Sequence, residues 1–477
     1  MRGFHTHRRP GMSYFPQLSL EDPGKQRTVE NILSPLLLSA QKITKIRDIF
    51  KNELELGLQK NPKRVSSLQM ELTYLPELPN GTEKGEFLAL DLGPTNVRVM
   101  HILLDAEPQF KVKYYTVPEA VRLGQGEKLF DYLAECIHVF LQENELLAKE
   151  LPLGFCFSFP MTQKALDVGL LVTWTTNYNC SGVVGKDVVL MLKEAVARRG
   201  DLNIDIVAIV NDATGTLVKG AFLDPNCAIG LILGTGSNAC YLEKLDRIEK
   251  WEGERCDEES DEVVIDIEWG AFGDNGVLNF IKTDFDKALD ENSLLVNSFT
   301  FEKLFSGKHL GELVRIVLVK LVREKMLFEG RASETILTGR SLKSADISQL
   351  EGDDGESRAR EIFARLGYIK ASDDDIAIAR YVCGVVSARA AQLVSICLAV
   401  LLERMQKPTV TIAIDGSVYK HHPRFHTLMT EYISTMAPNR PFKLMLAEDG
   451  SGKGAGLVAA VADRLRRAAQ RRASAQQ

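Results

Sequence analysis

The stretch IGLILGTGSN, from Ile229 to Asn238, decides the fold, because a short apolar run ends there in a turn of glycine and hydroxyl residues. The same pattern occurs three more times: Val207–Val210 leads into Asn211-Asp212, Val263–Ile267 into Glu268-Trp269-Gly270, and Val410–Ile414 into Asp415-Gly416-Ser417. Short apolar runs bounded by turn residues are typical of buried strands. Ligands of open α/β sheets bind beyond the carboxyl ends of the strands, so we expect the four polar ends to share one cleft.

Helical patterns alternate with these strands. Apolar residues recur at helical spacing in four segments: Ile43–Leu58, Lys128–Glu145, Gly311–Phe328 and Ile376–Met405. Two further β-type runs, Phe87–Leu92 and Val97–Leu104, are separated only by Gly93-Pro94-Thr95-Asn96, which predicts a hairpin. This alternation favours α/β layers.

Composition excludes several classes of protein. The 477 residues carry 58 basic and 64 acidic side chains, a net charge of −6, which does not favour a nucleic-acid partner. The longest uncharged apolar run, Leu393–Leu402, is shorter than the roughly 20 residues that cross a bilayer, so no transmembrane segment is expected. The first twenty residues do not fit a secretory signal, although a weak organelle-targeting tail, and with it mitochondrial association, stays open.

The cysteines and the C-terminus give weaker signals. Eight cysteines without a C-x-x-C pair predict reduced, buried thiols and a cytosolic protein. The last residues form an alanine-rich helix that ends in Arg464, Arg466, Arg467, Arg471 and Arg472. We interpret them as a frayed basic tail, with a contact to nucleic acid or lipid as the alternative.

Two turns are candidates for binding phosphate. A Walker loop is excluded, because Gly452-Lys453 is followed by Gly454 and Ala447 stands where the first glycine would be. The candidates are Asp91–Asn96, with the sequence DLGPTN, and Gly234–Ser237, with the sequence GTGS. Glycine lets backbone N–H groups approach an anion, and Ser or Thr adds a hydroxyl donor. A plain hairpin turn is the alternative for each.

Asp212 stands at the end of an apolar strand, after Asn211. A carboxylate at this position can accept a proton from a substrate hydroxyl, as the base in phosphoryl transfer does. It can equally cap the helix that follows. This segment alone leaves both interpretations open.

The chain resembles the hexokinase family. The stretch LGFCFSFP, Leu153–Pro160, together with Gln163, Leu166, Gly169, Trp174 and Thr175, is similar to the sugar-binding signature of that family. The resemblance runs in order from about Ile32 to Arg466 and is greatest to single-unit animal hexokinases, most of all those of insects. It continues through Asn211-Asp212, Gly234–Asn238, Glu268–Asp274, Phe301–Lys303, Gly311–Arg315, Asp415–Lys420 and Glu448–Gly452.

The resemblance implies a fold and a domain order. The fold is α/β, a two-lobed actin-like (ribonuclease H-like) ATPase with a cleft between a small and a large lobe, and a monomer is expected. The implied division is a polar leader without regular structure (1–30), an N-terminal helical segment packing on the large lobe (31–80), the small lobe (81–210), the large lobe (211–449), and a helix returning to the small lobe with a basic tail (450–477).

The resemblance also implies ATP-dependent phosphorylation of the 6-hydroxyl of glucose or a related hexose, with Asp212 as the general base. Magnesium would arrive with ATP, without a dedicated protein cage, near Asp91. The implied sugar-binding residues are Ser158, Thr175, Thr176, Asn211, Asp212, Asn238, Glu268 and Glu302. The implied ATP-binding residues are Asp91, Gly93, Thr95, Asn96, Arg98, Gly234, Thr235, Gly236, Ser237, Gly307, Lys308, Ser344, Ser348, Ser417, Val418 and Tyr419.

Three residues depart from the family pattern. Pro94 replaces a glycine of the phosphate turn and removes one N–H donor, Thr176 replaces a lysine that reaches the reacting phosphate, and Phe299 replaces a sugar-contacting glutamine. These changes favour an alternative, a catalytically weakened relative that binds sugar and regulates. A third possibility, an actin-like filament or chaperone ATPase, does not need the sugar segment from Ser158 to Thr175.

Overall fold

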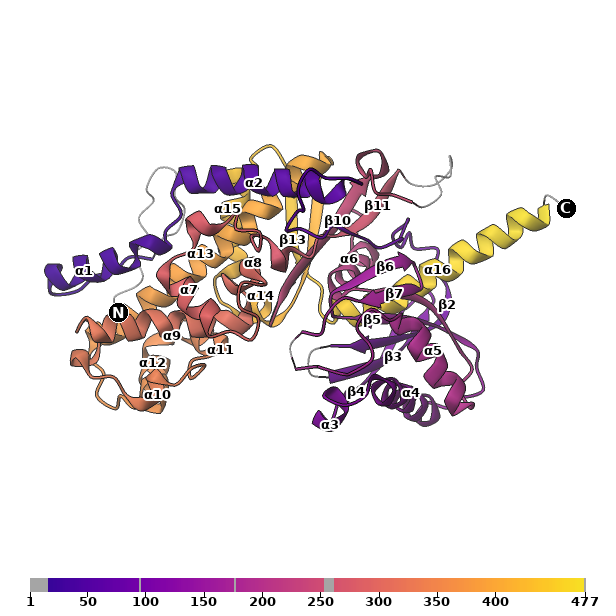
Figure 1. Ribbon diagram of the computed structural model, residues 1–477, viewed down its shortest axis with the longest axis horizontal. Helices are drawn as coiled ribbons and strands as arrows, with labels where there is room; N and C mark the ends of the chain where they lie inside the picture. Colours follow the sequence, from indigo (N-terminus) through magenta and orange to yellow (C-terminus); the bar gives the residue numbers. More distant parts are fainter. Residues whose placement is uncertain (1–15, 94–95, 176, 253–260, 476–477) are drawn as a thin grey trace.

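The chain forms two lobes, each built around one sheet, in a computed structural model that describes residues 16–93, 96–175, 177–252 and 261–475 (Figure 1). The small-lobe sheet has the order β4-β3-β2-β5-β8 and the large-lobe sheet the order β1-β11-β10-β9-β12-β13. The predicted α/β alternation is therefore confirmed. The four predicted strand ends belong to two sheets, because β8 lies in the small lobe and the other three strands in the large lobe.

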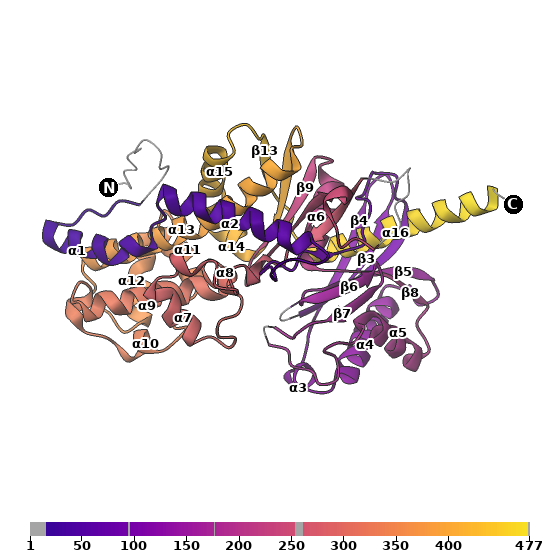
Figure 2. The same cartoon turned by 45° about the horizontal axis from the view of Figure 1, so that its top comes forward.

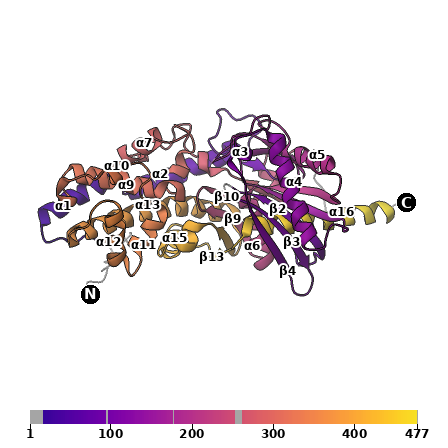
Figure 3. The same cartoon turned by 90° about the horizontal axis from the view of Figure 1, so that it is seen from below.

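The small-lobe sheet is covered on both faces. Alternate residues of β2 point to opposite faces: Leu88 and Leu90 pack with α4 and α5, whereas Phe87 and Ala89 pack with α16. Figure 3 shows α4 lying across this sheet. The elements are β2 (Gly85–Leu92), β3 (Asn96–Leu104), β4 (Gln109–Thr116), β5 (Leu151–Phe157), β6 (Met161–Ala165), β7 (Val168–Leu171), β8 (Ile204–Val210), α3 (Glu119–Arg122), α4 (Gly126–Glu143) and α5 (Val188–Arg199).

The large lobe packs a long central helix and its neighbours beside a second sheet. Its strands are β1 (Glu71–Leu72), β9 (Cys227–Leu233), β10 (Ser237–Lys244), β11 (Glu262–Asp266), β12 (Val410–Asp415) and β13 (Phe442–Leu446). Its helices are α7 (Asp284–Glu291), α8 (Thr300–Lys303), α9 (Gly307–Arg323), α10 (Glu334–Leu337), α11 (Ser344–Glu351), α12 (Gly355–Arg365), α13 (Asp373–Met405), α14 (Ser417–His421) and α15 (Phe425–Met436).

Helices α6 (Asp212–Leu223) and α16 (Gly450–Ala475) cross between the two sheets. They approach backbone to backbone, since a Cβ on Gly454 would lie 1.9 Å from the carbonyl oxygen of Gly215. Both positions therefore require glycine. The crossing fixes the first residue of α6, Asp212, at the junction of the lobes.

Helix α13 is long and apolar enough to cross a membrane, with a mean hydropathy of 2.0 over its most apolar window. It is longer than any uncharged apolar run of the sequence because charged residues such as Arg389 lie within it. The rest of the protein buries this window completely. The central helix of a globular domain has the same length and composition, so these two properties alone do not indicate a membrane span.

The two ends of the chain differ from expectation. Residues 23–30 of the predicted irregular leader belong to α1 (Pro23–Leu33), which begins after the capping residue Asp22 and buries Val29. Residues 1–15 lie outside the described part. Helix α2 (Ala40–Leu58) then runs along the large lobe (Figure 2).

The predicted frayed tail is also wrong, because α16 stays helical to Ala475. Arg464 pairs with Glu77 at 2.7 Å and Arg466 pairs with Asp205 at 2.8 Å. These ion pairs tie Arg464 and Arg466, in the middle of the helix, to neighbouring acidic side chains.

Candidate active site

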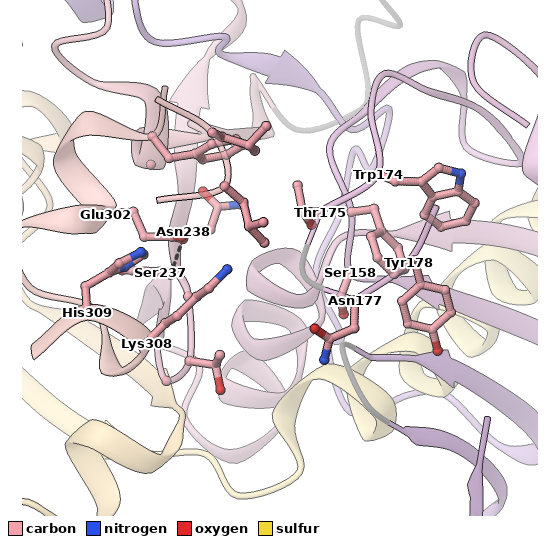
Figure 4. A pocket seen from close by; sticks show the side chains of 18 of the residues that line it. Ser158, Trp174, Thr175, Asn177, Tyr178, Ser237, Asn238, Glu302, Lys308 and His309 are labelled. Carbon is pink, nitrogen blue, oxygen red and sulfur yellow. Dashed lines mark hydrogen bonds between the residues drawn. The ribbon is translucent and has the colours of Figure 1, made fainter. Parts of the chain in front are cut away.

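A cavity of about 1300 Å³ opens between the lobes, and both lobes line it. In Figure 4, Ser158 and Thr175 face it from the small lobe, and Asn238 and Glu302 from the large lobe. The polar ends of all four predicted strands reach it, as the sequence pattern predicts. The sugar-site candidates that line it are Ser158, Thr175, Asn211, Asp212, Asn238, Glu268 and Glu302.

Two amides and two carboxylates form a buried network on the large-lobe wall. Asn211 Nδ2 donates to Glu268 Oε1 at 3.2 Å, and Asn238 Nδ2 donates to Asn211 Oδ1 at 3.1 Å and to Asp266 Oδ1 at 2.7 Å. Asn211 also caps α6, since its Oδ1 accepts from the N–H of Ala213. The amides are thus oriented before any ligand binds.

Glu302 is held by the second candidate phosphate turn. Its Oε2 accepts from the backbone N–H of Ser237 at 2.9 Å. A Cβ on Gly236 would lie 2.8 Å from the same oxygen, so a larger residue there would displace the Glu302 carboxylate. Burial raises the pKa of Glu302, although the Ser237 N–H and Lys308 oppose the shift.

Asp212 is the first residue of α6 and faces the cavity. Burial raises its pKa to about 7, and the nearby Asp91 carboxylate adds to the rise. It is not the residue that caps α6, because Asn211 fills that role. The structure therefore removes the capping alternative and leaves Asp212 as a carboxyl group that titrates near neutral pH.

Asp91, the first residue of the first phosphate turn, belongs to a charged cluster around Arg98. Arg98 forms ion pairs with the buried Asp91 and, at 3.3 Å, with Asp449, and it donates to Ser451 Oγ at 2.7 Å. Asp415 accepts from the N–H groups of Gly416 and Gly450. Gly93 and Arg98 line the cavity, whereas Asp91 and Asn96 do not.

The second phosphate turn packs against the start of α9. The N–H of Gly307 donates to the carbonyl oxygen of Gly234 at 2.8 Å, and the N–H of Lys308 to that of Thr235 at 3.0 Å. Ser344 Oγ donates to the carbonyl oxygen of Gly307. A smaller cavity of about 580 Å³ adjoins this region and shares Ser417 with the large one; its lining includes Ser344, Ser348 and Val418.

Sequence comparison decides the family of this site. Two hexokinase family models match, one over residues 28–222 and one over residues 228–461. A solved structure, hexokinase from Schistosoma mansoni complexed with glucose, is 39% identical, covers 93% of this chain and 100% of its own, and superimposes with a TM-score of 0.86. The chain belongs to the hexokinase family.

Curated hexokinases are similar over most of this chain. Hexokinase-2 of Homo sapiens is 42% identical over 463 residues, or 95% of the chain, and hexokinase-1 of Mus musculus is 40% identical over 453 residues, or 93%. The chain spans about half the length of these relatives, 50% and 46% respectively. The special likeness to insect hexokinases stays a prediction.

The hexokinase site does not include every residue predicted from the sequence. Thr95 and Thr176 lie outside the described residues, as does Pro94. Tyr419 lines neither cavity, and its hydroxyl contacts His426 Nδ1 at 2.6 Å. Phe299 lines the large cavity and lies against Gly270, 3.2 Å from where a Cβ would be.

Sequence reasoning missed Asp266 and Ser451. Asp266 is the last residue of β11 and was counted as part of an apolar strand. The signal was an acidic residue inside that strand, two positions before Glu268. Ser451 lies in the Glu448–Gly452 stretch of the family resemblance, and its contact with Arg98 depends on the return of α16 to the junction of the lobes.

Proposed function

We propose that this hexokinase-family protein transfers the γ-phosphoryl group of ATP to the 6-hydroxyl of glucose or a related hexose, the first step of glycolysis. The position of Asp212 carries the proposal, since it faces the cavity together with the sugar-site carboxylates and both phosphate turns. The solved glucose complex of a relative with 39% identity supports a hexose as the substrate.

Asp212 would act as the general base. A base works best when its pKa lies near the working pH, and the pKa of Asp212 is raised to about 7. General-base assistance contributes about 10²- to 10⁴-fold to rate. Orientation of the sugar and stabilisation of charge on the phosphoryl group would supply the rest.

The cavity suits a hexose because it offers both acceptors and donors. Glu268 and Glu302 can accept from hydroxyl groups, and the hydroxyl groups of Ser158 and Thr175 can donate and accept. A sugar that lacks a hydroxyl would leave these groups unpaired, so the cavity is expected to discriminate strongly against such sugars.

The nucleotide would lie toward Gly93, Arg98, Thr235 and Ser417. Magnesium enters as part of MgATP and neutralises phosphate charge. Asp91 Oδ1 is buried and has no hydrogen-bond partner among the described residues, which fits an acceptor for a water of the hydrated ion.

A sugar-binding relative with little turnover is the second candidate. Phe299 favours it, because an apolar ring lines the cavity beside Gly270 and offers a sugar no hydrogen bond. Pro94 and Thr176, the other two departures, lie outside the described residues.

One assay separates the two candidates. Purified protein is incubated with glucose and MgATP, and formation of glucose 6-phosphate is compared with that of Asp212→Ala. Turnover well above the variant supports the enzyme. Glucose binding in calorimetry with turnover no higher than that of Asp212→Ala would favour the regulatory relative.

We further propose a cytosolic monomer. The support is that Cys136, Cys156, Cys180, Cys227, Cys240, Cys383 and Cys397, the described cysteines, are buried and free, as expected of reduced thiols. Sedimentation of the purified chain, and microscopy of a tagged chain in cells, would test the two parts separately.

A further inference from the structure

Most of the lysine and arginine side chains that line the large cavity are already bound to other groups of the protein. Among the described residues these side chains are Arg98, Arg122, Lys303, Lys308, Arg315 and Arg340. Arg98, Lys303 and Arg315 pair with carboxylates, and Arg122 donates to two backbone carbonyl oxygens. Lys308 and Arg340 have no side-chain hydrogen bond or ion pair within the part of the chain that the structure describes.

Lys308 begins beside the second phosphate turn. It is the second residue of α9, and its N–H donates to the carbonyl oxygen of Thr235 at 3.0 Å. Its side chain extends into the cavity on the side of Ser237 and Glu302 (Figure 4). Burial lowers the pKa of Lys308, although the nearby Glu302 carboxylate opposes the shift. The ammonium group therefore lies near both a phosphate turn and a sugar-site carboxylate.

The surroundings of Lys308 give a cation no structural advantage. The N-terminal end of a helix carries partial positive charge, so a cation in the first turn of α9 is unfavourable. Arg340 and Lys303 place further positive charge nearby. Burial and these three cations lower the pKa of the next residue, His309, to about 3. A charged group held in unfavourable surroundings inside a cleft is typical of a functional residue.

The proposed reaction needs positive charge at this place. The 6-hydroxyl oxygen forms a bond to the γ-phosphorus as Asp212 takes its proton. The bond from that phosphorus to the bridging oxygen breaks, and its electron pair leaves with ADP. Negative charge spreads over the oxygens of the transferred group, whereas Glu268 and Glu302 also line the cavity. The lysine that the family pattern provides for this charge is replaced by Thr176.

We propose that Lys308 is a catalytic residue whose Nζ donates to the oxygens of the transferred phosphoryl group and stabilises their charge in the transition state. The inference rests on the proposed function and names a cation of the same site. Arg98 is less suited to this task because Asp91 and Asp449 already neutralise it.

Lys308→Met tests the proposal because it removes the charge and keeps an unbranched side chain. Single-turnover transfer from ATP to glucose, measured by rapid quench, should slow by about 10²- to 10³-fold, as when one donor to a transition state is removed. The affinities for MgATP and for glucose, measured separately by calorimetry, should stay within about threefold, because the contact forms mainly in the transition state. Lys308→Arg keeps the charge and should recover at least about tenfold of the loss.

Binding of MgADP with aluminium fluoride in the presence of glucose gives a second readout that does not depend on turnover. The fluoride imitates the transferring phosphoryl group, so Lys308→Met should weaken this complex by a factor similar to its loss of rate. MgADP alone should bind within about threefold of the unmodified chain.

Arg340→Met is the matched control, since it removes the same charge from the same cavity. The N–H of Arg340 donates to Glu312, one helical turn after Lys308, so its side chain starts farther from the phosphate turn. Rate and affinity for the fluoride complex should each change by less than about threefold in this variant. Lys308→Gln repeats the measurements if Lys308→Met does not fold.

Four results would overturn the inference. They are a transfer rate of Lys308→Met within about threefold of the unmodified chain, an equal loss in Arg340→Met, a fall in MgATP affinity with an unchanged rate constant, and a loss of glucose affinity as large as the loss of rate. The last result would mean that Lys308 acts only through Glu302. If the unmodified chain transfers no more phosphoryl than Asp212→Ala, the proposed function itself fails, and the inference with it.

Discussion

Asp286 and Asp266 are both buried carboxylates of the large lobe, but Asp286 has a cationic partner and Asp266 has an amide partner. Arg389 meets Asp286 with two parallel hydrogen bonds, at 2.8 and 2.9 Å, and also donates to the carbonyl oxygen of Ile281. Burial alone would raise the pKa of Asp286, but Arg389 and the Thr283 N–H hold it below its usual range. Asp266 has amides and other carboxyl groups around it instead.

The difference separates structure from function. A bidentate buried ion pair fixes two segments distant in sequence, here α13 and the start of α7. A cluster of like charges costs stability, and such clusters with raised pKa values are typical of functional sites. We therefore expect changes at Asp286 or Arg389 to affect folding, and changes in the carboxylate cluster of Asp212, Asp266 and Glu268 to affect activity.

The largest effect on activity is expected for Asp212→Asn. Loss of the base should lower the rate of phosphoryl transfer by about 10²- to 10⁴-fold. The free energy of unfolding should stay the same or rise, because an uncompensated carboxylate is removed. Steady-state kinetics and urea unfolding of the same preparation check both parts. A variant that loses stability together with activity would place Asp212 with Asp286, as a structural residue.

The largest effect on stability is expected for Arg389→Met. Removing one partner of a buried ion pair leaves an unpaired charge and costs about 3–5 kcal/mol. The surviving folded fraction should keep its rate of phosphoryl transfer per molecule, since Arg389 lies away from the cavity lining.

The double variant Arg389→Met/Asp286→Leu is the control. Replacing both charges by apolar side chains should recover most of the lost stability, because no buried charge remains. Failure to recover would mean that Asp286 acts mainly through the Thr283 capping box of α7.

How far the sequence predicts this molecule depends on whether a signal is local. Strands, the hairpin and the long helices follow from apolar spacing. The helix α1 also had a local signal, Asp22 before Pro23, which fits a capping residue and the first helical position. In contrast, the basic end of α16 looked unsupported because Glu77 and Asp205 are far away in the sequence.

The same distinction holds for the candidate site. Asn211, Asp212 and Glu268 were predicted because each follows an apolar run directly in the sequence. Asp266 was not predicted, because its hydrogen bond to Asn238 depends on the pairing of β11 with β10. The sequence also does not predict that the four similar strands divide between two sheets, because packing of the whole chain decides which strands pair.

A third and smaller effect should appear in the pH dependence of stability. The pKa of Asp212 is about 7 in the folded protein and near 4 when unfolded, so the folded state holds a proton that the unfolded state releases as pH rises from about 4 to 7. Stability from this group is therefore lost as pH increases. Asp286, with a lowered pKa, stabilises above the unfolded pKa and loses its contribution as pH falls.

Urea unfolding at pH 4.5 and pH 8 checks these opposite signs. Relative to the unmodified chain, Asp212→Asn should be similar in stability at pH 4.5 and more stable by about 1–3 kcal/mol at pH 8, a range reduced from the full shift because the side chain is partly open to solvent. Asp286→Asn should lose stability at pH 8 and lose less of it in acid. Equal effects at both pH values would contradict the assigned charge states.

The smallest expected effect is at Phe299, on the edge of the carboxylate cluster. Phe299 has a left-handed backbone with φ of 55°, and its N–H donates to Asp274 Oδ2 at 3.0 Å, so the backbone is held whatever the side chain. Phe299→Gln would place an amide in the cavity that Glu268 and Glu302 also line. One added hydrogen bond to a sugar hydroxyl contributes about 1 kcal/mol, which corresponds to a severalfold lower KM for glucose.

Phe299→Leu is the matched control, because it shortens the ring without adding a donor or an acceptor. We expect Phe299→Gln to lower the KM for glucose severalfold while Phe299→Leu does not, with the KM for MgATP unchanged in both. Unfolding free energies should stay within about 0.5 kcal/mol of the unmodified chain, as for other partly exposed positions away from buried networks. If both variants lose stability and neither changes the KM for glucose, Phe299 stabilises the fold, as Arg389 does, and does not contribute to the sugar site.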